Sequence, residues 1–138
     1  MADSSGSHPA TRMAVEVQVS FRYTIINGAD PSQRSTEQKA VAKTLTLAGL
    51  TFESPEMVVG GFHLSFADAT FGRNTLEIVL DLGKKFDVVE VLGEVDFYER
   101  RSGPTGSSFL VGVVFTDIPA DALAVLRDFL RQSQSATQ

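Results

Sequence analysis

Strict alternation of apolar and polar residues dominates the first third of the sequence. Between residues 13 and 25 the apolar positions are Val15, Val17, Val19, Phe21, Tyr23 and Ile25, and the polar positions between them are Glu16, Gln18, Ser20, Arg22 and Thr24. Successive side chains of a β-strand point to opposite faces, so this period of two predicts a long strand with one buried and one solvated face. Such a strand requires partners along its edges.

Further strand-like patterns occupy residues 40–53, 57–66, 75–82, 87–99 and 109–116. The connections between them are short or rich in glycine and proline, which favours antiparallel hairpins over helical crossovers. Only residues 119–131 have helical period, with one apolar face made by Ala122, Leu123, Leu126, Phe129 and Leu130. We therefore expect a mainly β fold, a six-stranded antiparallel barrel whose C-terminal helix covers one opening.

Composition limits the classes of function. A chain of 138 residues without cysteine predicts one domain, here 12–131 between flexible tails at 1–11 and 132–138, with no disulfide, zinc–thiolate site or thiol nucleophile. The net charge of −5 opposes binding to nucleic acid polymers or anionic lipid. No secretion signal or apolar run of membrane length is found, so we expect a cytoplasmic protein without membrane insertion.

The adjacent glycines Gly60 and Gly61 lie between two apolar stretches, in SPEMVVGGFHLSF. A phosphate-binding loop would lead into a helix, but these glycines lead into a strand pattern, which excludes that interpretation. Two interpretations remain open. The glycines form a structural bulge, or they belong to the ligand corner of a small barrel.

The order of four segments resembles the PilZ domain family. These are MVVGGFHL, FGRNTLEIVLDL, VEVLGEVDF and FLVGVVF, followed by the terminal helix, and together they cover residues 57–131. The resemblance implies a six-stranded barrel that binds cyclic di-GMP and passes the signal to a partner. Its ligand residues would come from an Arg-x-x-x-Arg motif and an Asp/Asn-x-Ser-x-x-Gly motif.

The second motif fits two registers. With Gly61 as its glycine, Glu56 takes the acidic position and Val58 the serine position, beside Gly60. The second register uses Thr44, Thr46 and Gly49, and ranks lower because it needs an additional hairpin later in the chain. The first register loses a hydroxyl and the second loses a carboxylate, so each leaves polar atoms of the ligand without a partner.

The arginine motif is equally incomplete. Its spacing gives His8 and Arg12 before the first strand, or Arg34 and Gln38 before the second. Either choice has a single arginine for a dianionic ligand, and losing charged hydrogen bonds of about 1.5–3 kcal/mol each weakens binding strongly. We therefore expect deficient cyclic di-GMP binding and no other cofactor.

The remaining polar residues make no convincing catalytic or metal site. His63 is the only histidine in the expected fold, and a surface or hydrogen-bonded role is favoured for it. Asp87, Glu94 and Asp96 are interpreted as a solvated face, and Arg100-Arg101 as basic turn residues. The sequence thus predicts a non-catalytic adaptor that acts through a protein partner, by resemblance in motility, pilus or surface behaviour. The alternative is a cyclic di-GMP receptor with unusual contacts.

Overall fold

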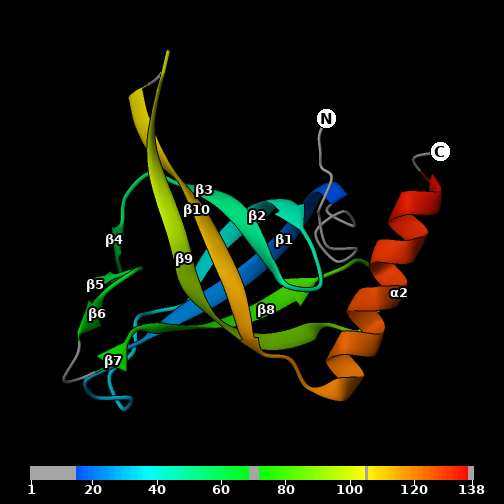
Figure 1. Ribbon diagram of the computed structural model, residues 1–138, viewed down its shortest axis with the longest axis horizontal. Helices are drawn as coiled ribbons and strands as arrows, with labels where there is room; N and C mark the ends of the chain where they lie inside the picture. Colours follow the sequence, from blue (N-terminus) through cyan, green and yellow to red (C-terminus); the bar gives the residue numbers. More distant parts are fainter. Residues whose placement is uncertain (1–14, 69–71, 105, 137–138) are drawn as a thin grey trace, which may run out of the picture.

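Six antiparallel strands close into a barrel in the computed structural model, which describes residues 15–68, 72–104 and 106–136 (Figure 1). Around the barrel the order is β1-β2-β3-β10-β9-β8. The strands are β1 (Val15–Ile26), β2 (Gln38–Leu45), β3 (Gly49–Ser54), β8 (Thr75–Asp81), β9 (Val89–Gly103) and β10 (Gly106–Asp117). The predicted fold class is confirmed.

The alternation in β1 builds the wall and the core together. Its inward-facing residues Val19, Phe21, Tyr23 and Ile25 are buried, while Ser20 and Arg22 between them are exposed. Phe21, Tyr23 and Phe52 of β3 form an aromatic cluster inside the barrel, with ring centroids 5.3–5.9 Å apart. The polar face of β1 therefore forms part of the outer surface, as the period of two predicts.

The membership of the barrel differs from the sequence prediction at two places. Residues 40–53 do not form one strand, because β2 and β3 are separate strands joined by a hairpin at Thr46–Ala48. Residues 57–66 are not a barrel strand. They contain β4 (Val58–Val59) and β5 (Phe62–His63), a small hairpin outside the barrel, and a second one, β6 (Ala67–Asp68) with β7 (Gly72–Arg73), follows. The predicted number of barrel strands is still six, because the division of residues 40–53 adds one strand and the exclusion of residues 57–66 removes one.

Strands β9 and β10 are longer than predicted. They pair from Leu92 and Asp117 to Gly103 and Gly106, and Figure 1 shows them extending past the rest of the barrel as a two-stranded arm. The register shifts at Asp96, between the pairs Gly112↔Phe97 and Val113↔Val95. This bulge reverses which residues face outward, and it places Phe97 on the outer surface.

Helix α2 (Ala120–Ala136) packs on the end of the barrel where β1 and β9 begin (Figure 1). Leu126 and Leu130 are both 0% exposed and belong to the same core as the barrel interior. Phe129 contacts Phe86 edge to face, with centroids 5.5 Å apart. The helix continues past Arg131 to Ala136, into the residues predicted as a C-terminal tail. The tail predicted at 1–11 lies outside the described residues.

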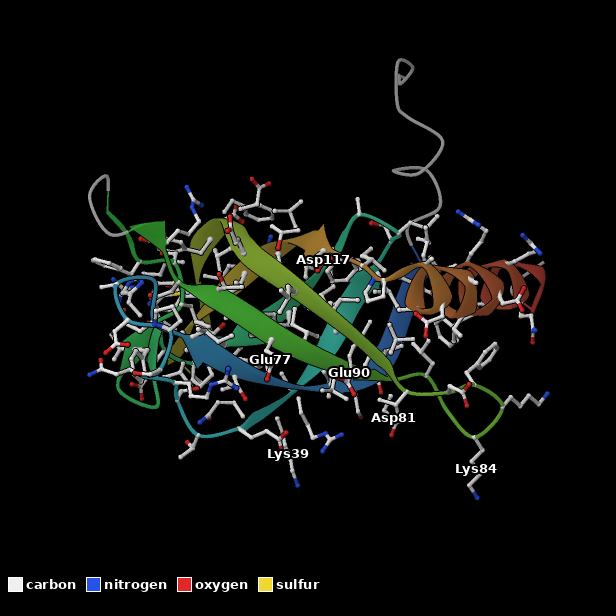
Figure 2. All side chains as sticks on the ribbon, turned by 90° about the horizontal axis from the view of Figure 1, so that it is seen from below. Lys39, Glu77, Asp81, Lys84, Glu90 and Asp117 are labelled. Atoms are coloured by element: carbon white, nitrogen blue, oxygen red, sulfur yellow. The ribbon has the colours of Figure 1, made fainter. Side chains whose placement is uncertain are left out.

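Charged side chains are distributed over the outside of the barrel. Figure 2 shows Lys39, Glu77, Asp81 and Glu90 on its outer surface, and Lys84 in the loop between β8 and β9. Pairs of opposite charge connect neighbouring elements, among them Arg34–Glu77 at 3.2 Å and Lys43–Glu53 at 3.3 Å. Within the described ranges, no helix is both long and apolar enough to span a bilayer.

Candidate functional site

Gly60 and Gly61 form the turn of the β4–β5 hairpin. Val59 pairs with Phe62 on either side of them, and both glycines have positive φ, 58° and 86°. Two central residues with positive φ are the signature of a type I′ turn, which glycine adopts without steric cost. The glycine pair is thus neither a bulge nor a phosphate loop. A Cβ on Gly60 would lie 3.0 Å from Cβ of Ser35, so the turn packs against the segment that leads into β2.

A hollow of about 370 Å³ lies beside this turn, between β2 and β3. We call it the β2–β3 slot. It brings together Glu56, Val58 and Gly60 of the first register with Gln38 of the arginine motif. The full lining consists of Tyr23, Gln38, Lys39, Ala40, Phe52, Glu53, Ser54, Pro55, Glu56, Val58, Val59 and Gly60.

The charges of the slot do not suit a dianion. Lys39 is its one basic lining residue, against the two carboxylates Glu53 and Glu56. Arg34, the expected arginine of this end, does not line the slot and pairs with Glu77 instead. Val58 is 55% exposed, so an apolar side chain occupies the surface where the first register places a serine.

The second register lies at the opposite end of β2, in the β2–β3 hairpin. The Oγ1 atom of Thr46 accepts hydrogen bonds from the backbone N–H groups of Ala48 and Gly49, at 2.9 and 3.0 Å. The Oγ1 atoms of Thr44 and Thr51 are 2.7 Å apart across the two strands. Both hydroxyls therefore stabilise the β2–β3 hairpin. The additional hairpin that this register requires later in the chain is also present, as β4–β5.

Gly49 also has a structural explanation. A Cβ on Gly49 would lie 2.0 Å from the carbonyl oxygen of Val113, so no larger residue fits where β3 approaches β10. Its presence at a motif position is therefore no evidence of a ligand.

A shallow groove of about 320 Å³ runs along the outside of β3, β9 and β10 beside this hairpin. We call it the outer groove. Its lining is mainly apolar and includes the exposed Val114 and Phe97, whose ring lies over Gly112. The single charged residue of the lining is Asp96. A negative charge in this position disfavours an anionic ligand.

Of the arginine-motif positions that the structure describes, Gln38 lines the slot beside the first register, whereas Arg34 does not. Arg34 lies in the loop before β2, at the end far from Thr46, since β2 spans eight residues or about 26 Å. His8 and Arg12 lie outside the described residues. Val15, three residues after Arg12 in the sequence, pairs with Leu45 next to the Thr46 hairpin.

Three of the other polar residues considered in the sequence, His63, Glu94 and Arg101, have partners within the fold. Nδ1 of His63 accepts a hydrogen bond from the backbone N–H of Ser65 at 3.1 Å. Glu94 pairs with Arg73 at 3.6 Å, and Arg101 pairs with Glu99 at 3.0 Å. Among the residues that the structure describes, no three His, Asp or Glu side chains are placed to hold a metal ion.

Two buried polar residues that sequence reasoning missed organise the slot end of the barrel. Asn74 accepts a hydrogen bond from the N–H of Gly28 and donates one to the carbonyl of His63, each 2.8 Å long. Ser35 accepts a hydrogen bond from the N–H of Ile25 at 2.9 Å. A polar residue beside a strand pattern gives no sequence signal of such long-range bonds.

Tyr23 is the most deeply placed titratable residue of the slot. It is 4% exposed, and burial raises the pKa of its phenol above the ordinary value of 10.0. The phenol therefore remains neutral and able to donate a hydrogen bond at physiological pH. Its hydroxyl makes no hydrogen bond to any residue that the structure describes.

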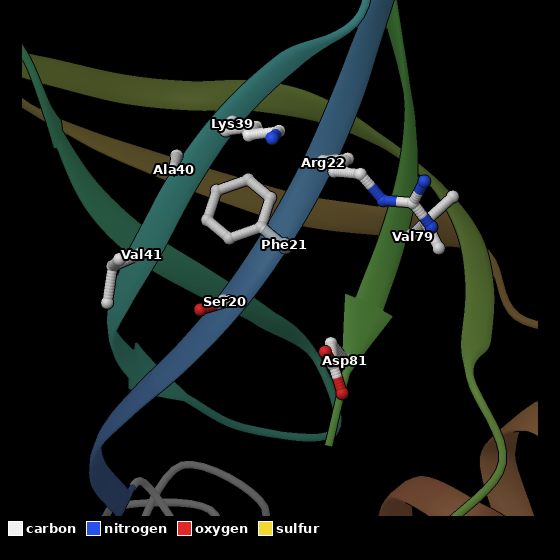
Figure 3. Close-up of a pocket in the computed structure, with 8 residues that line it drawn as sticks. All are labelled: Ser20, Phe21, Arg22, Lys39, Ala40, Val41, Val79 and Asp81. Carbon is white, nitrogen blue, oxygen red and sulfur yellow. The ribbon is translucent and has the colours of Figure 1, made fainter. Parts of the chain in front are cut away.

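A third hollow, of about 360 Å³, lies on the barrel wall across β2, β1 and β8 (Figure 3). Arg22, Lys39 and Asp81 line it together with Val41 and Val79. Charges of both signs surround it, and Arg22 is also 3.7 Å from Glu37. None of the positions that the PilZ resemblance assigns to ligand binding lines this hollow, although Gln38 is next to the lining residue Lys39 in the sequence.

Comparison with known proteins identifies related folds. No family model and no curated protein matches the sequence. Among solved structures, MrkH from K. pneumonia is similar with a TM-score of 0.67 and 10% identity, over 95% of this chain and 52% of MrkH. The barrel is PilZ-like.

Two further structures support the same fold. The PilZ domain of YcgR from Escherichia coli with c-di-GMP has a TM-score of 0.55 and 9% identity, over 85% of this chain and 84% of that domain. The Bacillus subtilis inhibitor of motility MotI/DgrA has a TM-score of 0.60 and 12% identity, over 91% of this chain. The chain spans about half the length of MotI and MrkH, covering 51% and 52% of them.

Proposed function

We propose that this PilZ-like domain is a non-catalytic signalling adaptor that acts through contact with a protein and is deficient in cyclic di-GMP binding. The chemistry of both motif registers supports this proposal. The hydroxyls of Thr44 and Thr46 are engaged within the hairpin, and Val58 cannot hydrogen-bond. Neither the slot nor the outer groove is lined by an arginine.

The exposed apolar side chain of Val58 is the observation that carries the proposal. It projects from the β4–β5 hairpin at the mouth of the slot, between Glu56 and the glycine turn. Met57 beside it is buried and Val59 is half-buried, so the hairpin is anchored to the core while Val58 faces solvent. A fixed apolar residue with charged neighbours is characteristic of a recognition surface.

The solved relatives indicate a cellular context. One of them is described as an inhibitor of motility and another as a domain in complex with c-di-GMP. Regulation of motility, pili or surface behaviour from the cytoplasm is therefore part of the proposal.

Calorimetric titration with cyclic di-GMP tests the ligand half of the proposal. We expect no saturable heat at low micromolar ligand, because two or three lost charged hydrogen bonds shift a micromolar Kd to about millimolar or weaker. Saturable binding in that range would instead establish the alternative, a receptor with unusual contacts.

Val58→Asp tests the protein half. The variant should fold, since the side chain is in solvent, and it should lose the partners that the wild-type chain captures from lysate of its own cells. Val88→Asp is the matched control, because Val88 is 53% exposed on the loop before β9, away from the slot. Capture that survives Val58→Asp would contradict docking at this hairpin.

A further inference from the structure

The wall of the barrel is not continuous between β2 and β3. The two strands pair only near their hairpin, through Leu45↔Leu50, Thr44↔Thr51 and Ala42↔Phe52. Beyond Ala42, β2 continues along β1 as far as the pair Tyr23↔Gln38. Beyond Phe52, β3 continues along β10 as far as the pair Phe109↔Ser54. Residues 38–41 and 53–54 thus each have one paired edge and one free edge.

The β2–β3 slot lies between these free edges. Its lining includes Gln38, Lys39 and Ala40 from β2, and Glu53 and Ser54 from β3. The ion pair Lys43–Glu53 crosses between the strands where pairing stops. At the other end, the Gly60 turn packs against Ser35 and Gln38. The opening is therefore bounded on all sides by described elements.

Free strand edges present backbone N–H and C=O groups at regular spacing. Figure 3 shows this part of β2, with Lys39, Ala40 and Val41 following one another along the strand. No backbone hydrogen bond joins residues 38–41 to residues 53–54. An extended peptide offers donors and acceptors with the same spacing, and it pairs with such an edge as an added strand.

The floor of the slot supplies a place for one side chain. Tyr23 and Phe52 face it from inside the barrel, with ring centroids 5.6 Å apart. The Tyr23 residue is 4% exposed, and its hydroxyl has no hydrogen-bond partner among the described residues. Tyr23 lines the slot, so this hydroxyl is a hydrogen-bond donor for an acceptor that enters it.

We propose that the β2–β3 slot binds a short extended peptide segment of a partner protein as an added strand. The segment pairs with the free edge of β2 and directs one uncharged polar side chain, such as Asn, Gln or Thr, onto Tyr23. The inference rests on the proposed function, since it specifies how the protein partner is held. Strand pairing determines the affinity, and the Tyr23 hydroxyl selects the residue that points inward.

The geometry favours a peptide over a small anion. The two carboxylates Glu53 and Glu56 outnumber Lys39 around the slot. A volume of about 370 Å³ holds one side chain with its adjoining backbone. The backbone donors and acceptors along the free edges of residues 38–41 and 53–54 match the spacing of a polypeptide backbone. They do not match a compact ion.

A library of random heptapeptides displayed on phage, selected against the full chain, provides the probe. Enriched peptides are then synthesised and titrated into isotope-labelled protein. We expect amide shifts and slowed hydrogen exchange to concentrate at residues 38–41 and 53–54. Failure to enrich any sequence, or shifts concentrated elsewhere, would overturn the proposal.

Single N-methyl groups on the peptide test strand pairing directly. An added strand directs alternate N–H groups at β2, so methylation at every second position should weaken binding about tenfold, while the intervening positions change it little. A uniform response along the peptide would contradict pairing.

Tyr23→Phe tests the selection of the inward residue. The variant keeps the ring and removes only the hydroxyl, and it should weaken an enriched peptide about three- to tenfold. Tyr98→Phe, on an exposed tyrosine of the β9–β10 arm, is the control and should leave affinity unchanged. Equal affinity in wild type and Tyr23→Phe would exclude the role of the hydroxyl.

Different results would contradict the peptide-binding slot and the proposed adaptor function. Ala40→Phe adds bulk to the slot, and far-UV circular dichroism and thermal melting establish whether the variant is folded. Partner capture that is lost in Val58→Asp but kept in folded Ala40→Phe would retain the adaptor function and overturn the slot. If Ala40→Phe does not fold, competition between an enriched peptide and the captured partner decides the same question: displacement supports the slot and its absence overturns it.

Discussion

At the scale of single residues, buried hydrogen bonds determine how the slot end is assembled. Asn74 links the β1–β2 loop through Gly28 and the β4–β5 hairpin through His63, using both ends of one amide. Its backbone N–H also bonds to the carbonyl of Phe66 at 2.9 Å. The Asn74 side chain therefore connects the β1–β2 loop to the β4–β5 hairpin, and its backbone N–H connects it to Phe66.

Asn74→Ala should destabilise the domain by about 1–3 kcal/mol, because it leaves two half-buried backbone groups, on Gly28 and His63, without their partner. For a chain of this length the melting temperature should fall by roughly 3–10 °C. Gln33→Ala is the control, since Gln33 bonds to Asn27 on the exposed surface and its loss should cost about 0.5 kcal/mol or less. Equal melting temperatures for the two variants would show that Asn74 is not a structural link.

Tyr23 makes stability depend on pH in the alkaline range. Burial raises the pKa of its phenol above 10.0, so the folded state retains this proton more tightly than the unfolded state. The resulting contribution is constant below pH of about 10 and is lost as the pH rises above it. Urea unfolding of wild type and Tyr23→Phe between pH 8 and 11 should show a steeper alkaline loss in wild type. Parallel curves would contradict the shift.

At the scale of elements, the sequence predicts strands by period but not their partners. Residues 13–25, 75–82 and 119–131 correspond to β1, β8 and α2, because each has a sustained pattern. The hairpin at Thr46–Ala48 interrupts a continuous apolar pattern, and a threonine hydroxyl bonding to backbone N–H groups forms it without Asn-Gly or proline. The Gly60-Gly61 turn, by contrast, joins two strands of only two residues each. The alternation of apolar and polar residues did not distinguish these short strands from a strand of the barrel.

Helix α2 is an integral part of the core. Leu126→Ala removes a side chain that is fully buried against the barrel and should cost about 2–5 kcal/mol, a large share of the roughly 5–15 kcal/mol typical of a domain. Arg127→Ala, next to it on the exposed face, should change stability by less than about 0.5 kcal/mol. Thermal melting of both variants by circular dichroism compares them. If both melt like wild type, the helix is a detachable arm.

At the scale of the whole molecule, the two candidate registers lie at opposite ends of the barrel. The Thr44, Thr46 and Gly49 hairpin is at the end where β1 begins, since Val15 pairs with Leu45. Glu56, Val58 and Gly60 are at the slot end with Gln38. Sequence spacing alone left both registers open and ranked the first higher, because the second needed an additional hairpin later in the chain. The β4–β5 hairpin is present at that place.

This arrangement predicts which repair restores cyclic di-GMP binding. Thr44→Asp and Thr46→Ser with His8→Arg complete both motifs in the second register. Glu56→Asp and Val58→Ser with Gln38→Arg rebuild them at the slot end. The first set should gain more affinity, because the β2–β3 hairpin is fixed by strand pairing and by the hydroxyl of residue 46, and a rigid site loses less entropy on binding.

Calorimetry of the two repaired chains, with a mixed set as the control, measures the difference. Gln38→Arg combined with Thr44→Asp and Thr46→Ser separates the arginine from residue 46 by the length of β2, about 26 Å, so it should gain little. The second-register set adds an arginine and a carboxylate, but the new carboxylate at residue 44 lies in the same groove as Asp96, which limits the gain in affinity. A larger gain from the slot-end set would place the dinucleotide corner at Gly61 and would make the slot a polar ligand site rather than a peptide site.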